Sequence, residues 1–151
     1  MKYRRNIGLG ESIALQMTDF VRSLNWPIEV IIPVPLGKNR LKERGYNQVG
    51  LVARPLAYRL GLKYEPEALR KMRETRSQVG LTVSQRRENV HDAYQADQKV
   101  VKGKSILIMD DVATTGSTIS ACTEALLSAG AQEIYVLTIA RALSHHSLNR
   151  V

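Results

Sequence analysis

The most regular pattern of apolar and polar residues lies in the last third of the chain. Residues 105–109 form a largely apolar run between charged neighbours, which is typical of a strand buried on both faces. Residues 117–129 place apolar side chains at helical spacing, and Gly130 is well placed to end that helix. A second apolar run follows at residues 134–140. This order predicts a βαβ unit with parallel strands and a right-handed crossover.

The amino-terminal half alternates helix and strand in the same way. Residues 11–24 place apolar side chains on one helical face, and Pro27 lies just after the expected end of that helix. Residues 30–32 predict a short buried strand. The prolines and glycine of residues 33–37 stop regular pairing, so we expect a loop at the carboxyl end of this strand.

Two segments in the middle of the chain are less regular. Apolar positions in residues 47–60 predict a further helix, which Pro55 should kink or restart. Residues 70–90 show no sustained period and mix glycine, serine and threonine with arginine. We therefore expect a long exposed loop there, with a helical turn near residues 85–89. Loops of this length in compact domains are usually functional or disordered.

Together these elements predict a single α/β domain over residues 1–151, built on an open, mostly parallel sheet flanked by helices. A chain of 151 residues is long enough for one sizeable core but not for two. No internal repeat, low-complexity stretch or linker divides it. In sheets of this kind ligands bind beyond the carboxyl ends of the strands, so functional residues are expected there.

Composition excludes several classes of protein. Apolar residues make up 44% of the chain and charged residues 24%, which is close to the globular average. Cys122 is the only cysteine, so no internal disulfide can form, and three histidines leave too few usual ligands for a structural zinc site. No apolar run approaches the roughly 18 residues that cross a bilayer, and the basic start leads into no secretory apolar stretch. We expect a cytoplasmic protein without membrane insertion, with Cys122 in its core.

The net charge of +8 is concentrated in two segments, residues 38–44 and residues 70–87. Together they carry ten basic and two acidic residues, so they account for the whole excess of positive charge. Both segments are expected to form loops. They suit a polyanion, which is either a phosphate-rich small molecule or a nucleic acid backbone. Solvated surface charge is the alternative interpretation of either segment taken alone.

The motif that carries chemistry starts at Asp110, directly after the predicted strand, and leads into the predicted helix. The backbone N–H groups and hydroxyls of residues 114–118 can surround an anion at the start of that helix, which suits a phosphate. Asp110 and Asp111 are ionised near neutral pH and repel phosphate, so they need hydroxyl groups or a cation. A sugar phosphate satisfies both parts of the motif. The non-functional alternative is an acidic turn followed by a capped helix.

From Ile106 to Thr118 the sequence closely resembles the signature of the type I phosphoribosyltransferases, a buried strand, two acidic residues, a short spacer and a Thr-Thr-Gly-Ser-Thr turn. The resemblance implies a type I phosphoribosyltransferase-like fold with a reduced hood. It also implies binding of 5-phosphoribosyl 1-pyrophosphate (PRPP) with Mg²⁺, with the acidic pair on the ribose hydroxyls and, through water, on the metal ion of Mg–PRPP. The implied PRPP-binding residues are Asp110, Asp111, Val112, Ala113, Thr114, Thr115, Gly116, Ser117 and Thr118.

Motifs further upstream resemble the ComF family of competence-associated proteins. These motifs are Val34-Pro35-Leu36, the run from Arg40 to Gln48, Arg76-Ser77-Gln78, Arg86 and Asn89-Val90. The resemblance covers most of the chain. Members of this family commonly carry an amino-terminal cysteine-rich zinc ribbon, and this sequence lacks the cysteines of that module.

The same resemblance implies a pyrophosphate loop and a flexible catalytic loop. The implied pyrophosphate loop consists of Leu36, Gly37 and Lys38, and the implied catalytic loop spans residues 71–87. Displacing pyrophosphate from the anomeric carbon builds negative charge on the leaving group, so cations aimed at it lower the barrier selectively. The candidate catalytic residues in the flexible loop are Lys71, Arg73 and Arg76.

Two functional hypotheses follow. The first is a magnesium-dependent phosphoribosyltransferase, a pentosyl-transferring glycosyltransferase that moves ribosyl 5-phosphate from PRPP to an acceptor and is linked to competence and DNA uptake. The second is a non-catalytic DNA-handling or regulatory protein that uses the basic segments on single-stranded DNA or acts with competence proteins. No residue identifies the acceptor, so a nucleobase, an amine and no acceptor at all stay open. The resemblance also implies a homodimer.

Overall fold

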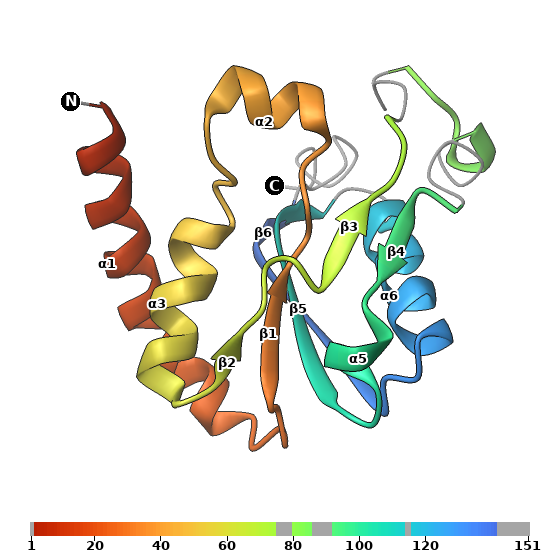
Figure 1. The fold of residues 1–151 in the computed structure, drawn as a ribbon. Coiled ribbons are helices and arrows are strands. Elements are labelled where there is room, and N and C mark those ends of the chain that lie inside the picture. Colours follow the sequence, from red (N-terminus) through yellow and green to blue (C-terminus); the bar gives the residue numbers. More distant parts are fainter. Residues whose placement is uncertain (1, 75–79, 86–91, 114–115, 142–151) are drawn as a thin grey trace, which may run out of the picture.

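The computed structural model describes residues 2–74, 80–85, 92–113 and 116–141, and Figure 1 shows their path. The helices are α1 (Lys2–Ser23), α2 (Lys38–Arg44), α3 (Gly50–Leu60), α5 (Gln98–Val101) and α6 (Ser117–Ser128). The strands are β1 (Val30–Pro33), β2 (Lys63–Tyr64), β3 (Leu69–Lys71), β4 (Tyr94–Ala96), β5 (Ser105–Ala113) and β6 (Glu133–Arg141). No helix in these ranges has the length and apolar character that crossing a membrane requires.

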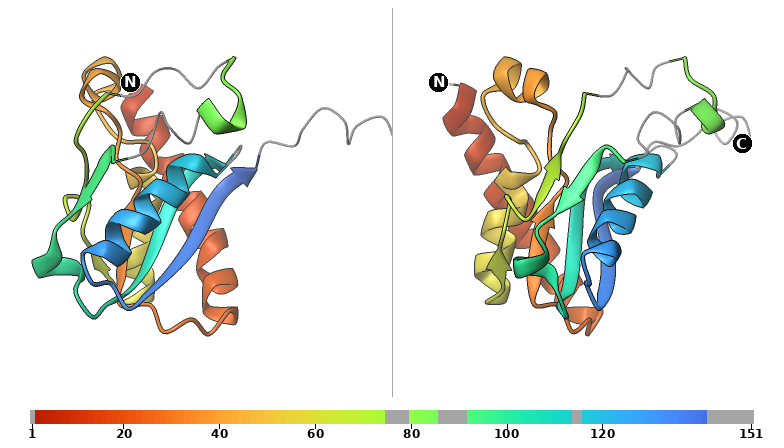
Figure 2. Two further views of the ribbon diagram at one scale, coloured as in Figure 1. Left: turned by 90° about the vertical axis from the view of Figure 1, so that its right-hand side faces the viewer. Right: turned by 45° about the vertical axis from the view of Figure 1, so that its right-hand side comes forward.

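Within the described residues, four parallel strands form the main sheet in the order β2-β1-β5-β6. Val30 of β1 pairs with Ile106 of β5, which in turn pairs with Ile134 of β6. Because α6 connects β5 to β6, the predicted βαβ unit is confirmed. α1 and α3 lie on one side of the sheet and α6 lies on the other (Figure 2). The predicted α/β architecture, an open parallel sheet flanked by helices, is therefore correct.

The central strands are buried on both faces, because helices pack against each side of the sheet. Ile31 and Leu107 belong to the core beneath α1 and α3, whereas Ile32 and Ile108 belong to the core beneath α6. All four side chains are fully shielded from solvent. This double burial explains why both segments are apolar at nearly every position rather than at every second one. Cys122 of α6 packs in the second of these cores, as predicted.

A small antiparallel sheet of β3 and β4 packs beside α6. Leu69 and Tyr94 contribute its apolar side chains to the core beneath α6. The expected loop over residues 70–90 therefore begins inside a strand. The prediction missed both strands because three residues are too few to establish a period.

Of the helical turn expected near residues 85–89, only residue 85 is described, and it ends a helical turn at residues 83–85. Thr82 and Gln85 cap it reciprocally. The Gln85 N–H donates to the Thr82 hydroxyl at 3.2 Å, and the Thr82 N–H donates to the Gln85 side-chain oxygen at 3.0 Å. This is the capping-box arrangement, whose Thr-x-x-Gln spacing is readable in the sequence. Residues 86–91 lie outside the described residues.

Two helices differ from the predicted boundaries. α1 begins at Lys2 rather than at residue 11, and α3 begins at Gly50 and continues through Pro55 instead of restarting there. Pro55 has no N–H to donate to the Leu51 carbonyl, and Gly10 of α1 packs against that part of the α3 backbone. A Cβ at Gly10 would come within 2.9 Å of the Leu51 carbonyl carbon, so glycine permits this close approach.

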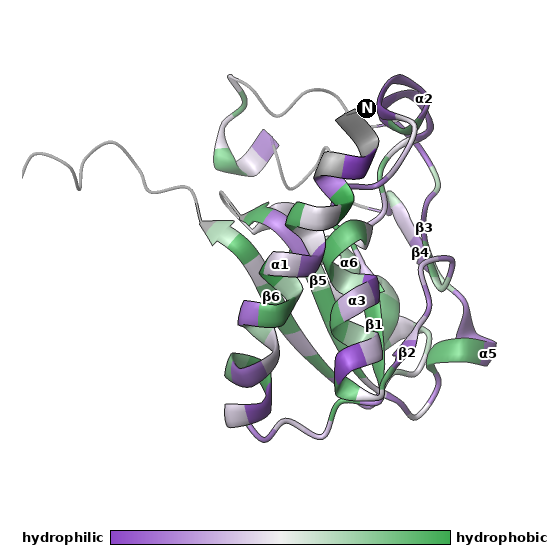
Figure 3. Cartoon of the chain, turned by 90° about the vertical axis from the view of Figure 1, so that its left-hand side faces the viewer, coloured by the Kyte–Doolittle hydropathy of each residue, from purple (hydrophilic) through white to green (hydrophobic). Residues whose placement is uncertain are grey.

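The basic segment 38–44 is helix α2 and not a loop, so that prediction was wrong. None of its residues is buried. Figure 3 shows it as a strongly hydrophilic helix at the end of the molecule where β1 finishes. A helix without a buried face gives no apolar period, which is why the pattern did not reveal it. Gly45 ends the helix in the left-handed conformation with φ of 79°.

Candidate functional site

The carboxyl ends of β1 and β5 bring two predicted site segments to one edge of the sheet. Pro33 pairs with Met109 in the parallel register, and the Val34 N–H donates to the Met109 carbonyl at 2.8 Å. From there the chain continues into residues 36–38 on one strand and residues 110–111 on the other. The segment of residues 36–38, predicted as a loop and called the 36–38 loop below, ends in Lys38, which is the first residue of α2. This segment and the acidic pair therefore start from neighbouring strands. This is the edge at which α/β sheets bind ligands.

The acidic pair lies within β5 rather than in a turn after it, because β5 runs to Ala113 and continues to pair with β6. The predicted strand end at residue 109 marks only the end of the apolar run. Asp110 and Asp111 are both partly buried. Asp110 Oδ1 accepts the Asp111 N–H at 2.8 Å, and Asp111 Oδ1 accepts the Val112 N–H at 2.8 Å. Neither carboxylate is enclosed in the core, so both stay accessible to a ligand.

The environment of Asp110 disfavours its charged form. Burial raises the pKa of the Asp110 carboxyl to about 6, and the negative charge of Asp111 acts in the same direction. The hydrogen bond from the Asp111 N–H opposes this rise only in part. Carboxyl groups whose pKa is raised in this way occur preferentially at functional sites.

Replacing Asp110 by Asn should stabilise the folded protein at neutral pH. Because the folded pKa of about 6 lies above the ordinary value of 3.8, the folded state binds this proton more tightly than the unfolded state. The contribution of Asp110 to stability therefore falls as the pH rises through this interval and stays low above it. With allowance for solvent screening, we expect Asp110→Asn to raise the free energy of unfolding at pH 7.5 by about 1 kcal/mol.

Urea unfolding measures this effect at pH 7.5 and at pH 3.5, where Asp110→Asn should change stability little. The control is Asp19→Asn, which removes an exposed carboxylate from α1. A stability change at pH 7.5 that is the same in both variants would contradict the assignment.

Lys71 lies at the end of β3, in the small sheet that packs beside α6. Its amine lies 6.0 Å from the centre of the ring of Tyr94, its partner across the small sheet. Burial lowers the pKa of Lys71, whereas the nearby Glu74 carboxylate raises it. The Cys122 thiol interacts electrostatically with both Asp110 and Lys71. The two charged groups therefore both lie within electrostatic range of one residue in the core beneath α6.

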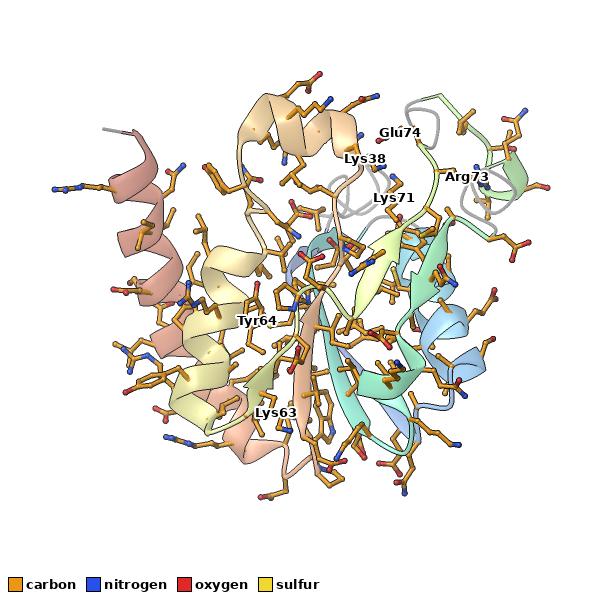
Figure 4. All side chains as sticks on the ribbon, in the orientation of Figure 1. Lys38, Lys63, Tyr64, Lys71, Arg73 and Glu74 are labelled. Carbon is orange, nitrogen blue, oxygen red and sulfur yellow. The ribbon has the colours of Figure 1, made fainter. Side chains whose placement is uncertain are left out.

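The three predicted catalytic cations differ in their placement. Figure 4 shows Lys71 close to Lys38 and Glu74, above the end of β1. Arg73 is exposed and lies farther from this group in the same view. Arg76 lies outside the described residues. The structure thus brings Lys71 and the 36–38 loop together.

The predicted phosphate loop is described only in part. Gly116 begins α6 in the left-handed conformation with φ of 78°, which glycine adopts without strain. Ser117 is buried and Thr118 is partly buried in the first turn of the helix. Thr114 and Thr115 lie outside the described residues, so their role in binding an anion stays a prediction.

Glu74 is a site residue that sequence reasoning missed. Its Oε1 accepts the Asn39 N–H at 3.2 Å, and its carboxylate covers Gly37. A Cβ at Gly37 would come within 2.9 Å of the Glu74 carboxyl carbon. Glu74 and Asn39 are 35 positions apart in the sequence, so no local pattern could have revealed this contact.

Asn47 fixes the chain that returns from α2 to the end of β1. Its Nδ2 donates to the Val34 carbonyl at 2.9 Å, and its Oδ1 accepts the Val49 N–H at 3.2 Å. Val34 immediately precedes the segment that leads into the 36–38 loop. The sequence marked Asn47 only as part of a family motif, and the structure gives it a positioning role.

The predicted role of Asp110 and Asp111 in binding Mg²⁺ through Mg–PRPP stays a prediction. In the described ranges, no three or more His, Cys, Asp or Glu side chains are grouped so that they could hold one. Mg²⁺ commonly binds through one or two carboxylates together with substrate phosphates. Asp110 and Asp111 are partly accessible and start from a strand that neighbours the 36–38 loop, which fits that mode of binding.

Comparison with known proteins agrees with this geometry. Residues 50–149 match the family model described as phosphoribosyl transferase domain. The chain is 32% identical over 148 residues to the DNA utilization protein YhgH of Salmonella typhi, and the match covers 95% of this chain and 65% of that protein. It is 34% identical over 116 residues to competence protein F of Haemophilus influenzae, with 76% of this chain and 51% of that protein covered. The chain thus spans between half and two thirds of the length of these relatives.

Solved structures show the same fold. The glutamine PRPP amidotransferase from B. subtilis superposes with a TM-score of 0.59 at 23% identity, covering 93% of this chain and 27% of that one. At this level of identity the similarity establishes the arrangement of helices and strands.

Proposed function

Because the chain belongs to the phosphoribosyl transferase domain family, and within it to the ComF-type competence proteins, we propose that it binds PRPP with Mg²⁺ and transfers ribosyl 5-phosphate to an acceptor. The observation that carries the proposal is the shared sheet edge of the acidic pair and the 36–38 loop. A diol and a pyrophosphate group are joined in PRPP through one ribose ring. Neighbouring strands can therefore bind both at once.

Each part of the site binds a different group of PRPP. Asp110 and Asp111 accept hydrogen bonds from the ribose hydroxyls, and the start of α6 receives the 5-phosphate. The 36–38 loop supplies backbone N–H groups to the pyrophosphate. Mg²⁺, when bound with PRPP, would neutralise charge on the pyrophosphate and hold it against the acidic pair.

In the proposed reaction an acceptor nucleophile attacks the anomeric carbon of the ribose. The new bond forms as the carbon–oxygen bond to pyrophosphate breaks, and the electron pair of that bond leaves with pyrophosphate. The proton of the attacking N–H group passes to solvent. In this proposal Lys71 and Lys38, which Figure 4 shows above the end of β1, interact with this negative charge and stabilise the transition state more than the bound substrate.

A pyrophosphate-release assay tests transfer directly. PRPP, Mg²⁺ and the protein are incubated with a panel of nucleobases and amines, and PRPP-dependent release of pyrophosphate is measured. We expect one class of acceptor to raise the release rate. A rate that equals the protein-free rate with every acceptor would contradict catalysis.

A second candidate function is favoured by the position of α2. This basic helix has no buried residue, and the matched relatives carry names that refer to DNA utilization and competence. A fully exposed cationic helix suits the backbone of single-stranded DNA. Binding by this helix should weaken roughly 10³-fold or more between 50 and 200 mM salt if about six phosphates are contacted. It should also be insensitive to Asp111→Asn.

A further inference from the structure

The Glu74 carboxylate occupies the 36–38 loop in the way an anionic ligand would. It accepts the Asn39 N–H at 3.2 Å, and its carboxyl carbon lies 2.9 Å from the position that a Cβ of Gly37 would occupy. Gly37 has an extended backbone with φ of −64°, and the atoms nearest to the position of an added Cβ all belong to the end of the flexible Glu74 side chain. The carboxylate therefore lies on the backbone surface that the proposed function gives to pyrophosphate.

The charges around Glu74 are those that an anion requires. Lys71 interacts favourably with the Glu74 carboxylate, and Arg40 and Arg73 lie close enough to influence the same lysine. Figure 4 shows Lys38 beside Glu74 on the adjoining element. A single carboxylate thus sits within a cluster of cations. Pyrophosphate, with more charge and more oxygen atoms, needs the same donors and the same cations.

We infer that Glu74 is an intramolecular competitor for the pyrophosphate group, which must displace the Glu74 side chain from the 36–38 loop before it can bind. This inference rests on the proposed function. It adds that Glu74 limits the affinity of the 36–38 loop for pyrophosphate. The same competition acts on the product, because the carboxylate can return to the loop as pyrophosphate leaves. A competitor that occupies a site about nine-tenths of the time lowers the apparent affinity about tenfold.

Isothermal titration calorimetry of the full chain with inorganic pyrophosphate and Mg²⁺ tests the inference. Glu74→Gln removes the charge and preserves the size of an exposed side chain, and we expect it to bind pyrophosphate about tenfold more tightly than the wild type. The matched control is Glu67→Gln, which removes the same charge from an exposed ion pair with Arg70. It should bind pyrophosphate as the wild type does. An unchanged or weaker affinity in Glu74→Gln, or no binding by it, would overturn the inference.

Titration with PRPP separates this inference from the proposed function. Suppose that Glu74→Gln and the wild type bind pyrophosphate equally, and that both bind PRPP only when Asp111 is intact. The inference that Glu74 competes with pyrophosphate is then wrong, and the proposed PRPP site is supported. Suppose instead that Glu74→Gln binds pyrophosphate more tightly than the wild type, but neither protein binds PRPP. The competition by Glu74 is then supported, and the proposed PRPP site is wrong. If Glu74→Gln gains about tenfold in affinity for both pyrophosphate and PRPP, the competition by Glu74 and the proposed PRPP site are both supported.

Discussion

Replacing Lys71 by Met should slow PRPP-dependent release of pyrophosphate about a hundredfold while leaving the protein folded. Removal of one group that stabilises charge developing in a transition state typically reduces the rate by 10²–10³-fold. Met keeps the apolar stem that packs beside Tyr94 and removes only the amine. Because burial already disfavours the charged amine, thermal stability should not fall.

Steady-state measurement of pyrophosphate release with the active acceptor checks this expectation. The control is Lys63→Met, which removes an exposed lysine from β2 at the opposite end of the sheet. The loss should appear in kcat more than in KM, since the amine acts on charge that develops as the bond breaks. Equal rates for the two lysine variants would show that Lys71 is not part of the catalytic site.

Replacing Asn47 by Ala should destabilise the protein and weaken PRPP binding together. The change removes the donor to the Val34 carbonyl and the acceptor for the Val49 N–H. Leaving such groups unpaired in a partly buried site costs about 1–3 kcal/mol. The 36–38 loop, which follows closely after Val34, then loses a constraint on its position, so we expect PRPP affinity to fall about tenfold.

Thermal unfolding and PRPP titration of the same variant check both parts of this prediction. Gln48→Ala is the matched control, because Gln48 neighbours Asn47 and its exposed side chain accepts a hydrogen bond from the exposed side chain of Arg44. Its effect on stability should stay within about 0.5 kcal/mol. If Asn47→Ala unfolds at the same temperature as Gln48→Ala, Asn47 has no positioning role.

The parts of the fold that the sequence predicted are those whose side chains form the two cores. β1 and residues 105–109 of β5 are buried at every position, and β6, at the edge of the sheet, contributes the buried Leu137 together with partly buried apolar side chains. α6 carries an apolar face because it packs on that sheet. The elements that were missed lack this constraint. α2 has no buried residue, and β2, β3 and β4 have two or three residues each.

The candidate site was predictable to the extent that it is local in sequence. Asp110 and Asp111 follow an apolar strand directly, so their place at the sheet edge could be foreseen. The sequence could not show that they lie within β5, because β5 continues to pair with β6 after the apolar run has ended. The contact of Glu74 with the 36–38 loop depends on tertiary structure alone.

The central claim is that the acidic pair holds the ribose of PRPP. Calorimetric titration of the wild type and of the double variant Asp110→Asn/Asp111→Asn with PRPP and Mg²⁺ tests it most directly. We expect the wild type to bind and the double variant to lose at least about a hundredfold in affinity, since charged hydrogen bonds contribute about 1.5–3 kcal/mol each. Equal heats of binding in the two proteins, or no heat in either, would contradict the account.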